Sequence, residues 1–127
     1  MRIGDNYARI KCVKLIDNQT FNAVLTSYTS SSIRCDAHRY FALLIDLDVT
    51  GAPTDIVFSV WFSHDNTTFF KYMNGPFGDL RYEDAAGDKL EAIHGDISGK
   101  YVKLTAVATG TGEQALFNVD AILVMMK

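Results

Sequence analysis

The sequence has little of what builds metal sites, cofactor sites or membrane anchors. Its 127 residues include two cysteines, three histidines, two prolines and a single tryptophan. Cys12 and Cys35 fit no metal-ligand spacing, and no two histidines are separated by one or three residues. No apolar run approaches the ~20 residues of a membrane-spanning helix. These absences argue against a structural metal, a cofactor and an integral membrane protein.

The sequence also lacks a catalytic frame. The serine-rich segment 27–32 contains no Gly-x-Ser-x-Gly elbow, and loop serines more often form turns than nucleophiles. The fifteen acidic residues make chance carboxylate pairs certain, so a pair alone does not indicate a glycosidase. Asp46 and Asp48 share one face of a predicted strand, where solvated acids are more common than calcium ligands. We therefore expect no enzymatic activity.

What the sequence does contain is a repeated alternation of apolar and polar residues, which is the period of a β-strand. The alternation is clearest over residues 39–49 and 56–63. A polar turn, His64-Asp65-Asn66, follows the second run and precedes another β-rich run, so residues 55–73 are predicted to form a hairpin. No stretch of twelve residues has a helical period. Further strands are predicted at residues 8–16, 20–26, 89–97, 101–109 and 115–126.

About eight antiparallel strands separated by turns predict an all-β fold, a single β-sandwich of the jelly-roll type over residues 8–127. Residues 1–7 are expected to form an N-terminal arm. A seven-stranded immunoglobulin-like sandwich is the nearest alternative. Both cysteines precede Trp61, however, so the Cys–Trp–Cys order of antibody domains is absent. Turns or irregular loops are predicted at residues 17–19, 27–32 and 74–88.

Residues that share a strand face predict which side chains form the core between the two sheets. The last strand differs from the others because it is apolar on both faces. This pattern indicates either a strand covered on both sides within the domain or a second surface for a subunit contact. The predicted core consists of Phe41, Leu43, Ile45, Phe58, Val60, Phe62, Leu104 and Phe117.

Charge is unevenly distributed along the chain. Residues 1–39 carry six basic and three acidic side chains, whereas residues 40–127 carry six basic and twelve acidic ones. The asymmetry suits a basic end that docks on an acidic protein surface, although solvated strand faces of mixed sign explain it equally simply. Six basic residues are too few for a nucleic-acid patch, and no phosphate-binding motif is present. The N-terminal residues lack the apolar segment of a signal peptide, which predicts synthesis in the cytoplasm.

Trp61 raises a carbohydrate-binding hypothesis, because sugars stack on exposed aromatic rings. Tyr72, Phe77, Tyr82 and Tyr101 could complete such an aromatic surface. A lone tryptophan in a β-sandwich strand is more often a core or interface residue. A carbohydrate-binding module therefore stays as an alternative to a protein-binding role.

Three segments within residues 40–126 have a pattern of strands and turns that is found in a known group of proteins. They read FALLIDLDVTGAP, FSVWFSHDNTTFFKY and ISGKYVKLTAVATGTGEQALFNVDAILV. Their order resembles small β-sandwich structural proteins of tailed bacteriophages, particularly head decoration or cement proteins, and is also similar to discoidin-like sandwiches. The resemblance implies a virion structural protein that stabilises the phage head by binding the major capsid protein and itself. A tail or neck component on the same fold is a further alternative.

For such a protein we expect the N-terminal arm and its basic side chains to contact the capsid, together with an aromatic loop. We expect no cofactor, metal, nucleic acid or membrane among its partners, and we expect it in the virion. The residues predicted to bind the partner are Arg2, Tyr7, Arg9, Lys11, Phe77 and Tyr82.

Overall fold

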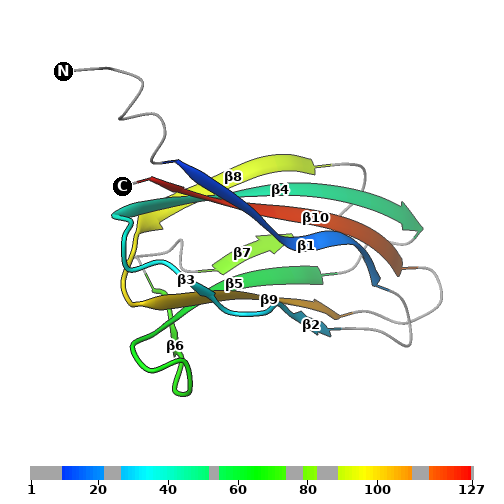
Figure 1. Ribbon diagram of the computed structural model, residues 1–127. Helices are drawn as coiled ribbons and strands as arrows, with labels where there is room; N and C mark the ends of the chain where they lie inside the picture. Colours follow the sequence, from blue (N-terminus) through cyan, green and yellow to red (C-terminus); the bar gives the residue numbers. More distant parts are fainter. Residues whose placement is uncertain are drawn as a thin grey trace.

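The computed structural model describes residues 10–21, 27–51, 55–73, 79–82, 89–109 and 115–126. The regular secondary structure in these segments consists of β-strands alone, and the strands form two layers (Figure 1). The prediction of an all-β sandwich is confirmed. Within the described segments no helix is long and apolar enough to cross a membrane.

One layer, which we call the terminal sheet, contains the first and the last strand in the order β1–β10–β4–β8. All neighbouring strands in it are antiparallel. β4 and β10 pair through all twelve residues of each strand, so they form the centre of the sheet. The strands are β1 (Lys11–Phe21), β4 (Tyr40–Gly51), β8 (Lys89–Asp96) and β10 (Ala115–Met126).

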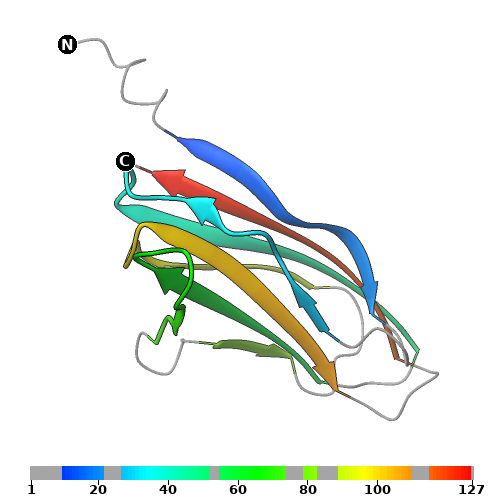
Figure 2. The same ribbon diagram turned by 60° about the horizontal axis from the view of Figure 1, so that its bottom comes forward.

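The second layer, which we call the hairpin sheet, has β5 (Asp55–Ser63) and β9 (Tyr101–Thr109) at its centre. Short strands occupy both of its edges. β2 (Ser27–Thr29) and β3 (Ile33–Arg34) both pair with β9. β6 (Phe70–Lys71) and β7 (Asp79–Tyr82) both pair with β5. Figure 2 shows that the strands of the two layers run in nearly the same direction, as in an aligned sandwich.

The strand pairing is that of a jelly roll. Two edge positions of the hairpin sheet are each filled by two short strands, so the ten described strands occupy eight positions. The pairing is nested from the chain ends inward: β1 with β10, β2 and β3 with β9, β4 with β8, and β5 with β6 and β7. An antiparallel ribbon wrapped into two sheets gives this nesting. The expectation of about eight strands in a jelly-roll-like sandwich is confirmed.

The predicted turn at residues 17–19 is wrong. β1 continues through these residues, and its register against β10 shifts between Lys14 and Ile16 and again between Ile16 and Gln19. Asn18 has a φ of 50°, a left-handed conformation that asparagine tolerates better than most residues. Residues that favour turns here form an irregularity inside one strand, because apolar partners on β10 continue the pairing on both sides.

Two segments predicted to be loops contain short strands. β2 lies inside the serine-rich segment 27–32, and β7 lies inside segment 74–88. Both are edge strands with a partner on one side, where polar residues suit the exposed edge. Sequence alternation over three or four residues is too short to reveal them. The predicted arm, residues 1–7, and residues 22–26 of the predicted second strand lie outside the described residues.

The hairpin turn after β5 is held by a network of side-chain hydrogen bonds. The Asp65 carboxylate accepts hydrogen bonds from the backbone N–H groups of Thr67 and Thr68, each at 2.9 Å, and from the Ser63 hydroxyl at 2.9 Å. These donors lower the pKa of Asp65 below its ordinary value. Asn66 supplies the left-handed residue of the turn, with a φ of 61°. The predicted hairpin is therefore confirmed, with β6 as its short second strand.

The core lies between the inner faces of the two sheets. Seven of the eight predicted core residues are at most 5% exposed: Phe41, Leu43, Ile45, Phe58, Val60, Phe62 and Leu104. The side chain of Phe117 lies outside the described residues. At one end of the core the rings of Phe41, Phe62 and Tyr72 have centroids 5.4–5.8 Å apart in tilted or edge-on contacts. Such contacts add to the stabilisation from apolar burial.

We expect Phe58→Ala to lower the free energy of unfolding by about 3–5 kcal/mol, because it leaves a cavity in the core. Phe70→Ala is the matched control, since Phe58 is 1% exposed and Phe70 is 65% exposed. The control should change the free energy of unfolding by about 0.5 kcal/mol or less. Urea unfolding followed by circular dichroism measures both changes. Equal losses in the two variants would contradict the assignment of inner and outer faces.

Candidate functional site

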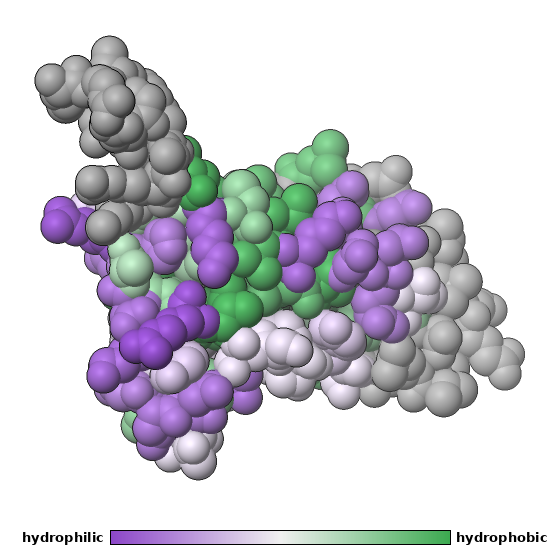
Figure 3. All heavy atoms as spheres, viewed as in Figure 1, coloured by the Kyte–Doolittle hydropathy of each residue, from purple (hydrophilic) through white to green (hydrophobic). Residues whose placement is uncertain are grey.

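The outer face of the terminal sheet presents apolar side chains to solvent. Tyr40 is 45% exposed, Leu44 40%, Met126 38% and Leu90 79%. No described strand covers this face (Figure 1), and Figure 3 shows hydrophobic surface along the layer that carries it, interrupted by hydrophilic residues. We call it the outer apolar face; it consists of Tyr40, Ala42, Leu44, Leu90, Ala92, Ile122, Val124 and Met126.

The strand register arranges these side chains in rows across the sheet. Val124, Ala42 and His94 form one row on β10, β4 and β8. Ile122, Leu44 and Ala92 form the next row. The apolar second face of the last strand is therefore part of a wider surface, and within the described residues it is not covered by another element of the domain.

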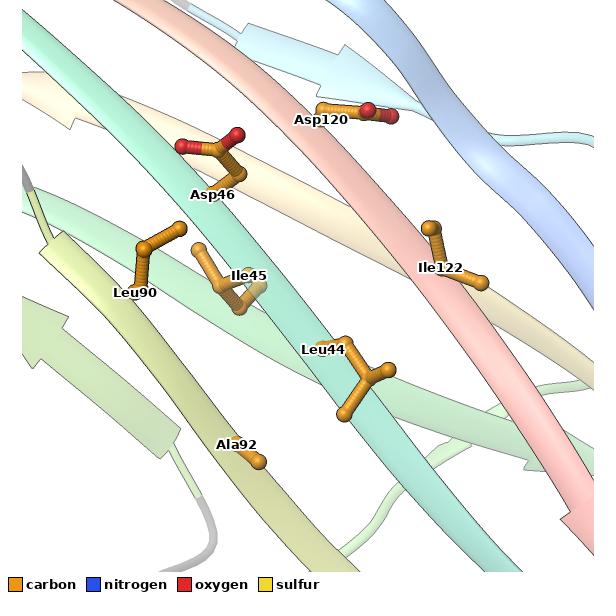
Figure 4. A pocket seen from close by; sticks show the side chains of 7 residues that line it. All are labelled: Leu44, Ile45, Asp46, Leu90, Ala92, Asp120 and Ile122. Atoms are coloured by element: carbon orange, nitrogen blue, oxygen red, sulfur yellow. The ribbon is translucent and has the colours of Figure 1, made fainter.

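A hollow of about 360 Å³ lies on this face. Its walls are apolar at one end and acidic at the other, as Figure 4 shows for side chains from β4, β8 and β10. The volume falls at the lower end of the range for small-molecule sites. The hollow is thus large enough to receive a side chain from a partner. The lining residues are Leu44, Ile45, Asp46, Leu90, Ala92, Asp120 and Ile122.

The acidic end of the hollow carries two carboxylates on directly paired residues, Asp46 and Asp120. Like charges at such positions repel each other. The Lys14 ammonium lies 3.5 Å from Asp120 Oδ2 and 3.4 Å from Asp17 Oδ1, which offsets part of that repulsion. The hydrogen bond to Asp17, followed by the charge of Asp120, raises the pKa of Lys14. Lys14 therefore stays charged at neutral pH and keeps the acidic end from being a purely negative surface.

The described residues contain no group of three or more histidine, cysteine, aspartate or glutamate side chains that could hold a metal ion. Asp46 and Asp48 lie on the exposed side of β4, as the alternation predicted.

Aromatic and basic side chains meet on the outer face of the hairpin sheet. The half-buried Trp61 donates a hydrogen bond from Nε1 to Thr105 Oγ1 at 2.9 Å, and the Lys71 ammonium lies 5.8 Å from the Trp61 ring centroid. The Lys103 ammonium lies 4.1 Å from the centroid of the Phe69 ring. Cations attract the faces of aromatic rings, so these lysines compete with any ligand that would stack there.

Tyr72 does not belong to this aromatic surface, contrary to the carbohydrate hypothesis. Its ring packs against the core, and its hydroxyl accepts a hydrogen bond from the backbone N–H of Asp96 at 3.3 Å. The backbone N–H of Tyr72 donates to the Val60 carbonyl at 2.8 Å, which holds the residue beside β5. Tyr101 is half-buried, and the Arg34 guanidinium lies 5.8 Å from its ring centroid. The side chains of Phe77 and Tyr82 lie outside the described residues.

The structure places two of the six predicted partner-binding residues. Lys11 is exposed at the start of β1 in the terminal sheet. The backbone of Tyr82 pairs with Ile56 in the hairpin sheet, so these two residues belong to different sheets. Arg2, Tyr7, Arg9 and Phe77 lie outside the described residues.

Sequence reasoning did not select the residues of the outer apolar face beyond the last strand. The alternation that sends Phe41 and Leu43 into the core places Tyr40 and Leu44 on the outward side of β4, but a single outward apolar residue is ordinary on a protein surface. The outward apolar residues of single strands indicate a shared surface only when β4, β8 and β10 are known to be neighbours. The register then places Leu44 beside both Ile122 and Ala92.

Both cysteines are free thiols in different environments. Cys12 is exposed on β1, whereas Cys35 is 1% exposed and its Sγ donates a hydrogen bond to the Gly99 carbonyl at 3.3 Å. Burial, with a smaller contribution from the charge of Asp36, raises the pKa of Cys35 to about 11.

We expect only Cys12 to react with a thiol reagent in the folded protein at neutral pH, because the reactive species is the thiolate and burial suppresses it at Cys35. Peptide mapping after labelling with iodoacetamide measures which cysteine is modified. Cys12→Ser, the control, should leave the folded protein unlabelled until denaturant is added. Labelling of Cys35 in the folded protein at a rate similar to Cys12 would contradict the assigned burial.

No protein-family model matches the sequence, and no curated protein is similar to it in sequence at a significant level. The fold is similar to solved structures at low sequence identity. A structure of the infectious bursal disease virus Gx strain superposes with a TM-score of 0.63 and 13% identity, covering 94% of this chain and 32% of that one. The chain thus spans about a third of the length of that virus protein.

Two further structures are similar over most of both chains. TmCBM61, solved in complex with β-1,4-galactotriose, gives a TM-score of 0.54 at 12% identity and covers 94% of this chain and 83% of that one. The SPBc2 prophage-derived protein YomS gives a TM-score of 0.52 at 11% identity and covers 93% of each chain. At these identities the likeness shows the fold alone, a β-sandwich shared by a virus protein, a prophage-derived protein and a carbohydrate-binding module.

Proposed function

We propose that this chain is a non-enzymatic structural protein of a virus particle that acts through protein–protein contacts. The outer apolar face of the terminal sheet carries the proposal. Contiguous exposed apolar surface on a small soluble domain marks an interaction site more often than it occurs without a partner. The fold shared with a bursal disease virus protein and a prophage-derived protein supports a virus particle as the setting.

In its specific form, the proposal is a decoration protein that stabilises a phage head by binding the major capsid protein and itself. The resemblance of residues 40–126 to phage decoration proteins supports this form. The basic N-terminal residues Arg2 and Arg9, together with the exposed Lys11, supply positive charge for an acidic capsid surface. Tyr7, Phe77 and Tyr82 provide aromatic contacts in the same proposal.

We expect the full-length chain to co-sediment saturably with capsids prepared from a phage whose gene for this chain is deleted. The bound fraction should fall as salt rises from ~0.1 M to ~1 M, because the Debye length falls from ~10 Å to ~3 Å. Lys11→Glu should reduce binding, and Lys100→Glu is the matched control, since both lysines are exposed.

Deletion of residues 1–7 should leave the sandwich folded, because β1 begins at Lys11, and should reduce occupancy of the capsids. Undiminished binding of the deletion variant at every salt concentration would show that the arm is not the contact. Failure of the full-length chain to bind capsids at low salt would overturn the decoration role.

A carbohydrate-binding module is the second candidate function. The partly exposed face of Trp61, on a fold similar to the galactotriose-bound TmCBM61, favours it. Against it, lysine ammonium groups already lie over the rings of Trp61 and Phe69.

We expect no saturable binding of neutral oligosaccharides on a glycan array, because Lys71 would have to leave the Trp61 ring before a sugar could stack on it. The control is Trp61→Ala, which removes the only tryptophan of the chain. Glycan binding that Trp61→Ala abolishes would favour the second candidate over the first.

A further inference from the structure

The outer apolar face has the composition of a self-complementary interface. Its central row carries the small side chains of Ala42 and Val124. On one side of this row lie Ile122 and Leu44, and on the other side lie Met126 and Tyr40. A second protein surface can therefore approach the sheet closely along the central row, with larger apolar side chains on both sides of that row.

We propose that two copies of the chain pair through this face about a two-fold axis that runs across the strands, near the row of Ala42 and Val124. The pairing deepens the proposed assembly role by naming the partner of the face. A two-fold axis makes the contact self-complementary, as in most dimers of identical chains. The row of Tyr40 and Met126 in one copy then faces the row of Leu44 and Ile122 in the other.

Tyr40 fits the hollow in this arrangement. The hollow begins at Leu44, Ala92 and Ile122 and extends to Asp46 and Asp120 (Figure 4). A tyrosine from the other copy, 45% exposed in the single chain, would place its ring against the apolar walls. Its hydroxyl would lie toward the carboxylates, which accept hydrogen bonds.

Charge favours this direction of the axis over an axis along the strands. One end of the sheet carries Asp17, Asp46, Asp48 and Asp120 with Lys14, a net of −3. The other end carries the exposed residues Arg39 and Asp96, which have no net charge together, whereas Lys11 pairs with the buried Met125 and so follows the inward side of the strand. An axis across the strands places the acidic end of each copy near Arg39 of the other, whereas an axis along the strands places acid against acid.

The area available suits a moderate dimer. Four strands spaced by ~4.8 Å and about eight residues at ~3.3 Å give roughly 500 Å² for each copy and roughly 1,000 Å² for the pair. This total lies at the lower limit of specific interfaces. We therefore expect reversible association at micromolar concentration.

Sedimentation equilibrium of the full chain between ~1 and ~200 μM tests the proposal. We expect a monomer–dimer equilibrium that Leu44→Lys weakens at least about tenfold, as for a central interface residue. Val107→Lys is the matched control, since Leu44 is 40% exposed and Val107 is 42% exposed and lies on the hairpin sheet. The control should leave the association constant unchanged, and thermal unfolding verifies that both variants fold.

The direction of the axis is tested by charge reversal. Arg39→Glu and Asp46→Lys should each weaken the dimer about fivefold, and the double variant should recover most of the loss. Lack of recovery in the double variant would overturn this two-fold register. A chain that stays monomeric at every concentration, or loses association equally with Leu44→Lys and Val107→Lys, would overturn the dimer.

Other occupants of the face give different results. If only the variant lacking residues 1–7 dimerises, the arm covers the face and the proposal fails. A chain that stays monomeric but binds capsids would refute the dimer and support the virion role. A chain that dimerises through this face but never binds capsids would support the dimer and refute the decoration role.

Discussion

The pairing of β4 with β10 is the constraint on which the rest of the structure depends. The two strands pair with each other through twelve consecutive residues at the centre of the terminal sheet. Because side chains alternate between faces, this register sends Leu43 and Leu123 into the core and Leu44 and Ile122 outward. A slip of one residue would reverse both faces at once. The core and the outer apolar face are therefore fixed by the same set of backbone hydrogen bonds.

The two sheets use their outer faces differently. On the outer face of the hairpin sheet, Trp61 is partly covered within the chain, by its hydrogen bond to Thr105 and by the Lys71 ammonium near its ring. The terminal sheet has no such cover over its central row in the described residues. This difference supports the proposal that protein contacts form on the terminal sheet rather than around Trp61.

Sequence alternation predicted the long strands and their faces because a period of two over eight or more residues is hard to mistake. It predicted Phe41 and Phe58 as core residues correctly. It failed where local chemistry and long-range pairing disagree: Asn18 favours a turn, yet β10 holds it within a strand. The outer apolar face could not be predicted, since Leu44, Ala92 and Ile122 become neighbours only through the order of the strands.

An exposed apolar surface on a sheet lowers the solubility of a protein, and the charged residues on this face limit that effect. The carboxylates of Asp46 and Asp120 lie at one end of the hollow, and Lys14 lies beside them. A partner that presents only apolar groups would bury two carboxylates with the single Lys14 ammonium as compensation, which is unfavourable. A partner with apolar side chains at the centre and a cation at the rim would satisfy both requirements. If the face binds a protein as proposed, it would favour a surface with this pattern of apolar groups and charge over a uniformly hydrophobic one.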